Sequence, residues 1–271
     1  MDLLKALILG VLQGATEFLP ISSSGHLVLV PWWLGWEKPP LIFDVVVHLG
    51  TLVAVLLYYW RDWLALANAG WRALRLRNFQ DPDARLLLLL ILGTIPAALA
   101  GALLEDLFES AFSEPPLVAG FLLVTALLLV LSERAYSAER TVSDLNTRDA
   151  LIVGTAQAFA IFPGISRSGS TIVAGMFRGL SRPAAARFSF LLATPIIMGA
   201  GAKQVLDVVT GDVSVGSDLV APLIVGFFTS AVVGFVCIWF LLRLLQKRRL
   251  YVFAAYCATF GTVSLLVALL T

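Results

Sequence analysis

The sequence predicts an all-α integral membrane protein, built as an inverted-topology repeat with six transmembrane helices and two re-entrant helical hairpins. The first observation is composition: 59% of the 271 residues are hydrophobic and only 14% are charged, whereas a soluble domain carries about 25% charged residues. The second is a set of six long apolar segments. The third is a pair of apolar segments that are each broken in the middle and resemble one another. We expect residues 1–271 to form a single membrane domain.

Six segments are long and apolar enough to predict transmembrane helices. A helix that crosses a bilayer needs about 20 mainly apolar residues. The stretch between the first two of these segments, residues 61–85, is expected to be a loop because it is rich in arginine. The six predicted spans are Ile42–Trp60, Arg85–Leu104, Pro116–Leu131, Ala185–Leu206, Leu219–Leu242 and Leu250–Leu270.

Two further apolar segments, residues 3–34 and 150–180, are interrupted by short polar runs. The first is broken at residues 19–25 and the second at residues 163–169, and each half is too short to cross comfortably. Backbone that is not helical at membrane depth is tolerated only where it is buried in protein or lines a wet cavity. The breaks therefore predict two re-entrant hairpins that meet inside the protein.

The two broken segments are related by a shift of 144 positions. The shift gives ten identities between residues 6–25 and 150–169 without a gap, and they include glutamine, serine and glycine as well as apolar residues. Each copy has one broken segment followed by three spans, so the odd number of spans turns the second copy upside down. We predict repeat one over residues 2–134, with its hairpin at 3–34, and repeat two over 147–270, with its hairpin at 150–180.

Charges in the connections predict how the chain is oriented. Arginine and lysine gather in residues 61–85, 134–148, 178–187 and 243–249, whereas aspartate and glutamate gather in residues 105–114 and 207–218. The positive-inside rule places the basic connections in the cytoplasm. Both termini and the opening of the active site are then expected on the periplasmic or extracellular side of the bacterial plasma membrane. The net charge of +1 predicts no nucleic-acid partner.

The polar residues at the breaks predict an anion site. A helix that starts at a break exposes free N–H groups and the positive end of its dipole. Arg167 is the strongest indication, because charge at membrane depth is costly and a guanidinium group matches phosphate oxygens. Hydroxyl groups at both breaks add hydrogen-bond donors: Ser22, Ser23, Ser24, Ser166, Ser168 and Thr171.

Glu17 and His26 flank the first break and complete a set suited to hydrolysis of a phosphate ester or anhydride. We expect Ser23 to be the nucleophile and His26, three residues further on, to be its base. Glu17 is expected to orient water or to bind a divalent cation. Direct attack by water, with Ser23 donating only a hydrogen bond, is the competing mechanism. His48 in the middle of a span is expected to be structural.

The runs "QGATEFLPISSSGH" and "PGISRSGST" resemble the two signature motifs of the bacterial undecaprenyl-diphosphate phosphatase family, also called the bacitracin-resistance family. The resemblance covers essentially the whole chain. It implies removal of the terminal phosphate of a polyprenyl diphosphate lipid, undecaprenyl diphosphate, which regenerates the carrier lipid of cell-wall synthesis. It also implies a divalent cation, Mg²⁺ or Ca²⁺. The functional positions that it carries over are Glu17, Ser22, Ser23, His26, Ser166, Arg167 and Thr171, with Gln13 at a position where the family has glutamate or glutamine.

At that position this chain has the amide, Gln13, and not the carboxylate. An amide can neither act as a base nor supply negative charge to a metal. If the chemistry is shared, Glu17 must be the essential carboxylate. Gln157, the counterpart of Gln13, is expected only to mark the duplication. A transporter or flippase of lipid phosphates, acting alone or coupled to hydrolysis, is the alternative function, because inverted repeats with broken helices are a transporter architecture. The sequence leaves open the nucleophile, the metal and whether the chain forms a homodimer in the lipid membrane.

Overall fold

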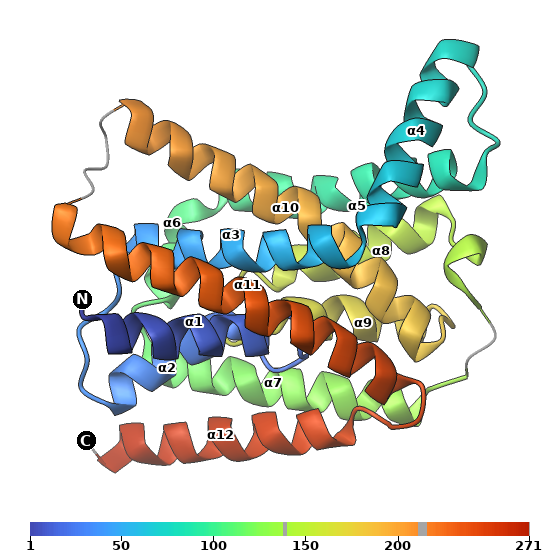
Figure 1. Ribbon diagram of the computed structural model, residues 1–271. Coiled ribbons are helices and arrows are strands. Elements are labelled where there is room, and N and C mark those ends of the chain that lie inside the picture. The colour runs from blue at the N-terminus through green and yellow to red at the C-terminus, as the bar shows by residue number, and fades with distance from the viewer. Residues whose placement is uncertain (138–139, 211–215, 271) are drawn as a thin grey trace.

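The computed structural model describes residues 1–137, 140–210 and 216–270, and in these residues the chain is helical throughout apart from its connections (Figure 1). Six of the helices are long and apolar enough to cross a membrane, and they identify the chain as a multi-pass membrane protein. These six are α3 (Leu41–Tyr58), α5 (Pro82–Leu103), α7 (Pro115–Arg134), α10 (Arg182–Thr210), α11 (Ser217–Leu245) and α12 (Tyr251–Leu270). The sequence prediction of six spans is confirmed in number and in place.

The expectation that residues 61–85 form a loop is wrong. Most of this segment is the helix α4 (Trp60–Leu76), which projects away from the bundle in Figure 1. Besides its arginines, the segment has a helical period of small and apolar residues, of which Leu66, Ala69 and Ala73 are buried. A second short helix, α6 (Glu105–Ala111), lies in the acidic connection. Of that acidic set, Asp212 lies outside the described residues, as do the side chains of Glu105, Asp106, Glu109 and Asp207.

Each broken segment forms two short helices. α1 (Leu3–Phe18) and α2 (Ser23–Trp33) have 16 and 11 residues, and α8 (Thr147–Phe159) and α9 (Arg167–Phe177) have 13 and 11. At a rise of about 1.5 Å per residue, none of the four spans the roughly 30 Å of a bilayer core. The bounds of α2 and α9 differ by 144 positions at both ends, which is the register of the sequence repeat.

Serine caps start α2 and α9 in the same way. Ser22 Oγ accepts a hydrogen bond from the Gly25 N–H at 3.2 Å, and Ser166 Oγ accepts one from the Gly169 N–H at 3.0 Å. In both copies the cap hydroxyl also lies within hydrogen-bond distance of the serine two residues further on. A cap of this kind stabilises a helix by roughly 1 kcal/mol. The caps therefore determine which residue is the first of each helix.

Glycines allow the first helix of each broken segment to pack closely on a long span. Gly10 of α1 lies against Gly226 of α11, and Gly154 of α8 lies against Gly93 of α5. A Cβ atom on Gly154 would come within 2.1 Å of the Gly93 carbonyl oxygen, so this contact requires glycine. Gly10 and Gly154 are 144 positions apart. Close backbone contact at small residues is a common way for helices to associate in membranes.

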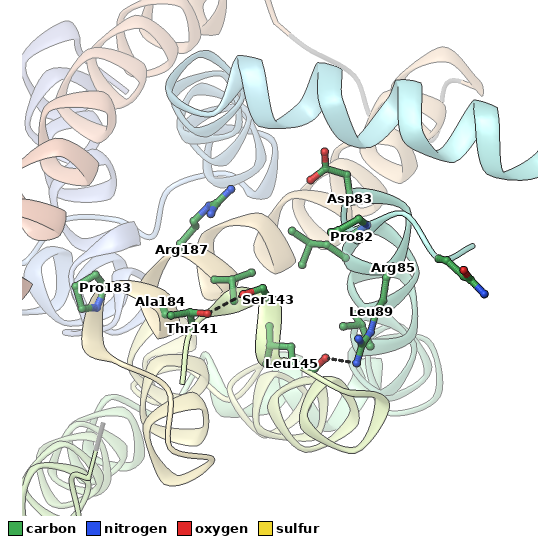
Figure 2. A pocket seen from close by; sticks show the side chains of 13 residues that line it. Pro82, Asp83, Arg85, Leu89, Thr141, Ser143, Leu145, Pro183, Ala184 and Arg187 are labelled. Atoms are coloured by element: carbon green, nitrogen blue, oxygen red, sulfur yellow. Dashed lines mark hydrogen bonds between the residues drawn. The ribbon is translucent and has the colours of Figure 1, made fainter. Parts of the chain in front are cut away.

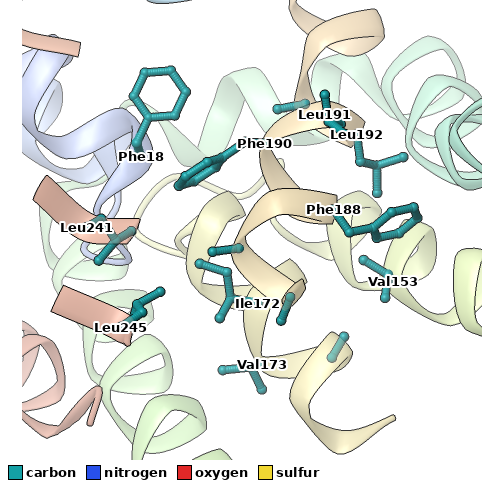
Figure 3. Packing of buried hydrophobic residues seen from close by; sticks show 14 of the residues in the cluster. Phe18, Val153, Ile172, Val173, Phe188, Phe190, Leu191, Leu192, Leu241 and Leu245 are labelled. Carbon is teal, nitrogen blue, oxygen red and sulfur yellow. The ribbon is translucent and has the colours of Figure 1, made fainter. Parts of the chain in front are cut away.

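The main hydrophobic core draws side chains from most of the helices, and Figure 3 shows the part of it to which α1, α8, α9, α10 and α11 contribute. The Phe18 ring of α1 packs edge-on against the Phe190 ring of α10, with centroids 5.2 Å apart. Ile172 of α9 and Leu241 of α11 are fully buried in the same cluster. Lipid tails are as apolar as leucine, so van der Waals contact rather than transfer from water stabilises this packing.

Ion pairs tie the start of α8 to the chain around it. The carboxylate of Asp149 accepts hydrogen bonds from Arg140 Nη2 at 2.5 Å and from Arg178 Nε at 2.7 Å, and it is fully buried. Burial raises the pKa of the Asp149 carboxyl, but the hydrogen bonds from Arg140 and Arg178 lower the pKa by more than burial raises it. The pKa therefore lies below its usual value of 3.8. These contacts fix the entry of the second broken segment.

Candidate active site

The site centres on the carboxylate of Glu17 in the last turn of α1. Glu17 is only 4% exposed. Its Oε2 accepts one hydrogen bond from Gln13 Nε2 at 3.0 Å and another from Ser23 Oγ at 2.5 Å. Gln13 lies one turn earlier on the same helix, whereas Ser23 is the first residue of α2. The chain reversal at the break therefore brings the Ser23 hydroxyl against the Glu17 carboxylate, six positions earlier in the chain.

Arg167 approaches the same carboxylate from the second broken segment. It is the first residue of α9, and its Nη2 donates a hydrogen bond to Glu17 Oε1 in an ion pair. Among the described residues, its Nη1 is buried and has no hydrogen-bond partner. A buried donor without a partner costs roughly 1–3 kcal/mol. The guanidinium group thus keeps one nitrogen available for an anion while the other holds Glu17.

A cavity of about 880 Å³ opens onto these groups. Glu17, Ser23 and Arg167 line it, and so do the predicted site residues Ser22 and Ser24. Much of the remaining wall is apolar and comes from Leu27, Val28, Trp32, Ile161, Ile196 and Ile197. A cavity of this size, mostly apolar with a few convergent polar groups, is typical of a ligand site. Its chemistry suits a molecule that is both apolar and anionic.

The structure does not bring His26 to Ser23. The His26 ring is 1% exposed and stacks on Phe260 of α12, with centroids 4.8 Å apart. Its Nδ1 lies 2.7 Å from the Ser22 carbonyl oxygen, and its Nε2 lies 2.7 Å from the Tyr256 hydroxyl. A carbonyl can only accept, so Nδ1 carries the proton and, in the neutral ring, Nε2 accepts from Tyr256. Both ring nitrogens are engaged, and neither is directed at the predicted nucleophile.

The contact with Ser22 has a structural consequence. Ser22 has a φ of 70°, a backbone conformation that residues other than glycine rarely adopt. Strain of this kind costs on the order of 1–3 kcal/mol and persists only where the surroundings impose it. By donating to the Ser22 carbonyl, His26 holds this conformation and with it the start of α2.

The remaining predicted site residues do not line the cavity wall. Ser166 caps α9, and Ser168 Oγ donates to the Leu19 carbonyl at 3.0 Å, which joins the two breaks. Thr171 Oγ1 donates to the Arg167 carbonyl at 2.8 Å and lies 2.6 Å from Ser189 Oγ. These hydroxyl groups are buried and engaged within the protein. In this arrangement they hold the start of α9 and so position Arg167, and their contact with a substrate stays a prediction.

The cavity also has polar residues that were not predicted as functional, among them His48, Asp44 and Gln157. His48 Nε2 lies 3.7 Å from Glu17 Oε2, while its Nδ1 lies 2.6 Å from the Asp44 carbonyl oxygen. Asp44 and Gln157 also line the cavity, and within the described part of the chain their side chains carry buried polar atoms without partners. An ionisable residue within a span is a sign of function. That sign was present in the sequence for His48 in the middle of its span, whereas Asp44 lies in the first turn of α3.

A metal held by protein side chains alone does not fit this site. In residues 1–137, 140–210 and 216–270, no group of three or more His, Cys, Asp or Glu side chains lies close enough together to hold an ion. Both oxygens of Glu17 already accept hydrogen bonds from Arg167, Gln13 and Ser23. Mg²⁺ is often bound by only one or two carboxylates together with substrate phosphates. A cation fits here only as a companion of a phosphate-bearing ligand.

A second cavity of about 490 Å³ lies between α5, α10 and residues 141–145 (Figure 2). Its two arginines are already engaged, since Arg85 Nη2 donates to the Leu145 carbonyl at 2.9 Å and Arg187 pairs with Asp62. None of the residues around Glu17 lines it. The chemistry-bearing groups of the two breaks therefore belong to the larger cavity.

Known proteins match this chain over its whole length. The family model described as "Bacitracin resistance protein BacA" matches residues 6–263. The undecaprenyl-diphosphatase of Desulforudis audaxviator is 44% identical over 270 residues, covering 100% of this chain and 99% of the relative. The undecaprenyl-diphosphatases of Pelotomaculum thermopropionicum and Thermomicrobium roseum are each 43% identical, over 268 and 275 residues, and cover 99% and 98% of this chain and 97% and 98% of the relatives.

Proposed function

Because the chain belongs to the bacitracin resistance protein BacA family, we propose that it hydrolyses undecaprenyl diphosphate to undecaprenyl phosphate and phosphate. This reaction recycles the carrier lipid for cell-wall synthesis and confers resistance to bacitracin. The observation that carries the proposal is the carboxylate of Glu17, which accepts from Ser23 and Arg167 at the wall of a mostly apolar cavity. The diphosphate meets the polar groups, and the isoprenoid chain meets the apolar wall.

The chemistry begins with Ser23 as the nucleophile and Glu17 as its base. Ser23 Oγ attacks the terminal phosphorus while Glu17 Oε2, at 2.5 Å, takes the hydroxyl proton. The bond from that phosphorus to the bridging oxygen breaks, and undecaprenyl phosphate leaves with the electron pair. Water then hydrolyses the phosphoserine and releases phosphate. Arg167 stabilises the charge on the phosphoryl oxygens through its available nitrogen.

This assignment moves the base from His26 to Glu17. A base must lie within hydrogen-bond reach of the group whose proton it takes, no more than about 3.2 Å between the heavy atoms. Glu17 Oε2 lies 2.5 Å from Ser23 Oγ, while both nitrogens of His26 are engaged elsewhere. His26 is instead a positioning residue for the strained Ser22. In the competing mechanism water attacks directly, Glu17 orients it and Ser23 only donates a hydrogen bond. A bound Mg²⁺ or Ca²⁺ stays a prediction. Glu17 would be the protein carboxylate that holds the cation, and the substrate diphosphate would supply further oxygen ligands.

We also propose that the fold is an inverted repeat with two re-entrant hairpins. The matching bounds of α2 and α9, their equivalent serine caps and the paired Gly10 and Gly154 contacts support it. Figure 1 supports the predicted orientation: both termini lie at one end of the bundle, and the basic connection between α11 and α12 lies at the other. The termini and the opening then face the periplasmic or extracellular side of the bacterial plasma membrane. A homodimer stays a prediction.

Phosphate release from the purified protein in detergent tests the function. With farnesyl or undecaprenyl diphosphate as substrate, we expect release by the wild type and almost none by Glu17→Gln, which keeps the shape of the side chain but cannot take a proton. A transporter or flippase of lipid phosphates is the second candidate, favoured by the paired broken helices. A folded wild type that releases no phosphate yet moves the lipid across vesicles would replace the phosphatase with that function.

A further inference from the structure

Gln157 is a buried amide that the catalytic proposal does not use. It lies in the last turn of α8, is 2% exposed and lines the large cavity together with Arg167. Neither its Nε2 nor its Oε1 has a hydrogen-bond partner among the described residues. The great majority of buried side-chain polar atoms in proteins are paired, and an unpaired one costs roughly 1–3 kcal/mol. A packing role would be served better by an apolar side chain.

The repeat explains how this amide lost its partner. In the first copy Gln13 donates to Glu17, four residues further along the same helix. The equivalent pair in the second copy, 144 positions later, is Gln157 and Ile161. The glutamine was kept, but its acceptor was replaced by an apolar side chain that lines the cavity. The amide of Gln157 is thus left without the partner that its counterpart has.

We propose that Gln157 is a substrate-binding residue, whose amide donates a hydrogen bond to a phosphate oxygen of the lipid diphosphate in the cavity that it shares with Arg167. Within the part of the chain that the structure describes, Arg167 Nη1 is also a buried donor of this cavity without a partner. An uncharged amide binds the diphosphate before and during the reaction alike, so its contribution falls on substrate binding rather than on the chemical step. This inference rests on the proposed function and deepens it.

The test compares Gln157→Met with the wild type in two assays. Methionine has a similar length but needs no hydrogen bond, so removal of an unpaired amide leaves the melting temperature Tm equal to or above that of the wild type. In the phosphatase assay, KM rises about tenfold or more, the effect expected for loss of one hydrogen bond to a charged group, while kcat changes little. Ile152→Met, at an exposed position of the same helix, is the matched control and leaves Tm and KM unchanged.

A second readout does not depend on turnover. Methylene diphosphonate, which cannot be hydrolysed, raises the Tm of the wild type by binding the folded state, and it raises the Tm of Gln157→Met much less. Gln157→Glu places a negative charge beside the negative diphosphate, so it lowers the affinity for methylene diphosphonate and raises the KM for substrate more than Gln157→Met does. An unchanged KM and an unchanged Tm shift in Gln157→Met overturn the inference. A clear fall in the Tm of ligand-free Gln157→Met also overturns it, because the amide would then be paired inside the protein.

The outcomes separate this inference from the proposed function. If the wild type releases no phosphate, the function fails, whatever the variants do. If the wild type is active and Gln157→Met matches it in KM and in the diphosphonate shift, the phosphatase stands and only the role of Gln157 falls.

Discussion

Ser23 and Arg167 are equivalent residues of the two broken segments, and each donates a hydrogen bond to a different oxygen of the same carboxylate. Ser23 bonds Glu17 Oε2 and Arg167 bonds Glu17 Oε1. Each is the first residue of a serine-capped helix, and they are 144 positions apart in the chain. One helix start thus supplies a hydroxyl group and the other a cation, and the site is complete only when both segments meet at Glu17.

Replacing Ser23 by alanine tests the nucleophile. We expect Ser23→Ala to lower kcat by about 10² or more, roughly 3 kcal/mol of barrier, because the attacking oxygen is removed while Glu17 and Arg167 stay in place. The measurement is phosphate release beside the melting temperature, which shows that the variant is folded. Turnover close to that of the wild type would discard the covalent step and favour direct attack by water.

Arg167→Lys tests whether the geometry of the guanidinium group matters beyond its charge. Lysine keeps a positive charge but cannot reach Glu17 with one nitrogen and present a second, fixed donor to phosphate. We expect normal insertion and a loss of kcat/KM that corresponds to about 3 kcal/mol or more. If the arginine served only to pair Glu17, the lysine variant would stay active, and Arg167→Ala combined with Glu17→Ala would be more stable than either single variant.

His26→Asn distinguishes a positioning residue from a base. The asparagine amide nitrogen can take the place of Nδ1 and donate to the Ser22 carbonyl, but asparagine cannot accept a proton from Ser23. We therefore expect His26→Asn to keep within about tenfold of wild-type kcat, whereas His26→Leu, which lacks the donor, loses about 10² or more. Equal and severe losses in both variants would return the role of base to His26.

Gly154→Ala tests the close packing of α8 on α5. An added methyl group would collide with the backbone of Gly93, so we expect a loss of about 1–3 kcal/mol in the free energy of unfolding. Gly120→Ala on α7 is the matched control, because nothing lies within 4 Å of a Cβ atom there, and alanine favours a helix by roughly 0.5–1 kcal/mol over glycine. Thermal unfolding in detergent gives both values, and equal effects would contradict the packing.

The pH dependence of stability reports on Asp149. Its folded pKa is lower than its usual value because of Arg140 and Arg178, so the unfolded chain binds the proton more tightly. The carboxylate then contributes stability above the usual pKa, and that contribution is lost as the pH falls through the lower folded value. We expect Asp149→Asn to have a lower Tm than the wild type at pH 7 and the difference to shrink below about pH 4. A difference that is constant with pH would show that the charge is unimportant.

The sequence by itself determined the membrane class and the six spans, and it identified three residues that the structure brings together, Glu17, Ser23 and Arg167. Apolar runs locate the spans because the bilayer leaves little choice of length and composition. Glu17, Ser23 and Arg167 could be identified because polar and charged groups at membrane depth are costly enough to need a function. The sequence also contains a helical period over α4, whereas its arginine content alone predicts a loop.

Only the tertiary structure decided which side chains face one another across the site. Spacing along the chain put His26 near Ser23, but stacking on Phe260 and the bond to Tyr256 direct its ring toward α12. His48, which is 31 positions from Glu17, instead lies beside it because α3 packs against α1. The direction of a side chain at a helix start depends on the backbone angles of the break and on its packing partners. Both are long-range properties, and local sequence spacing does not determine them.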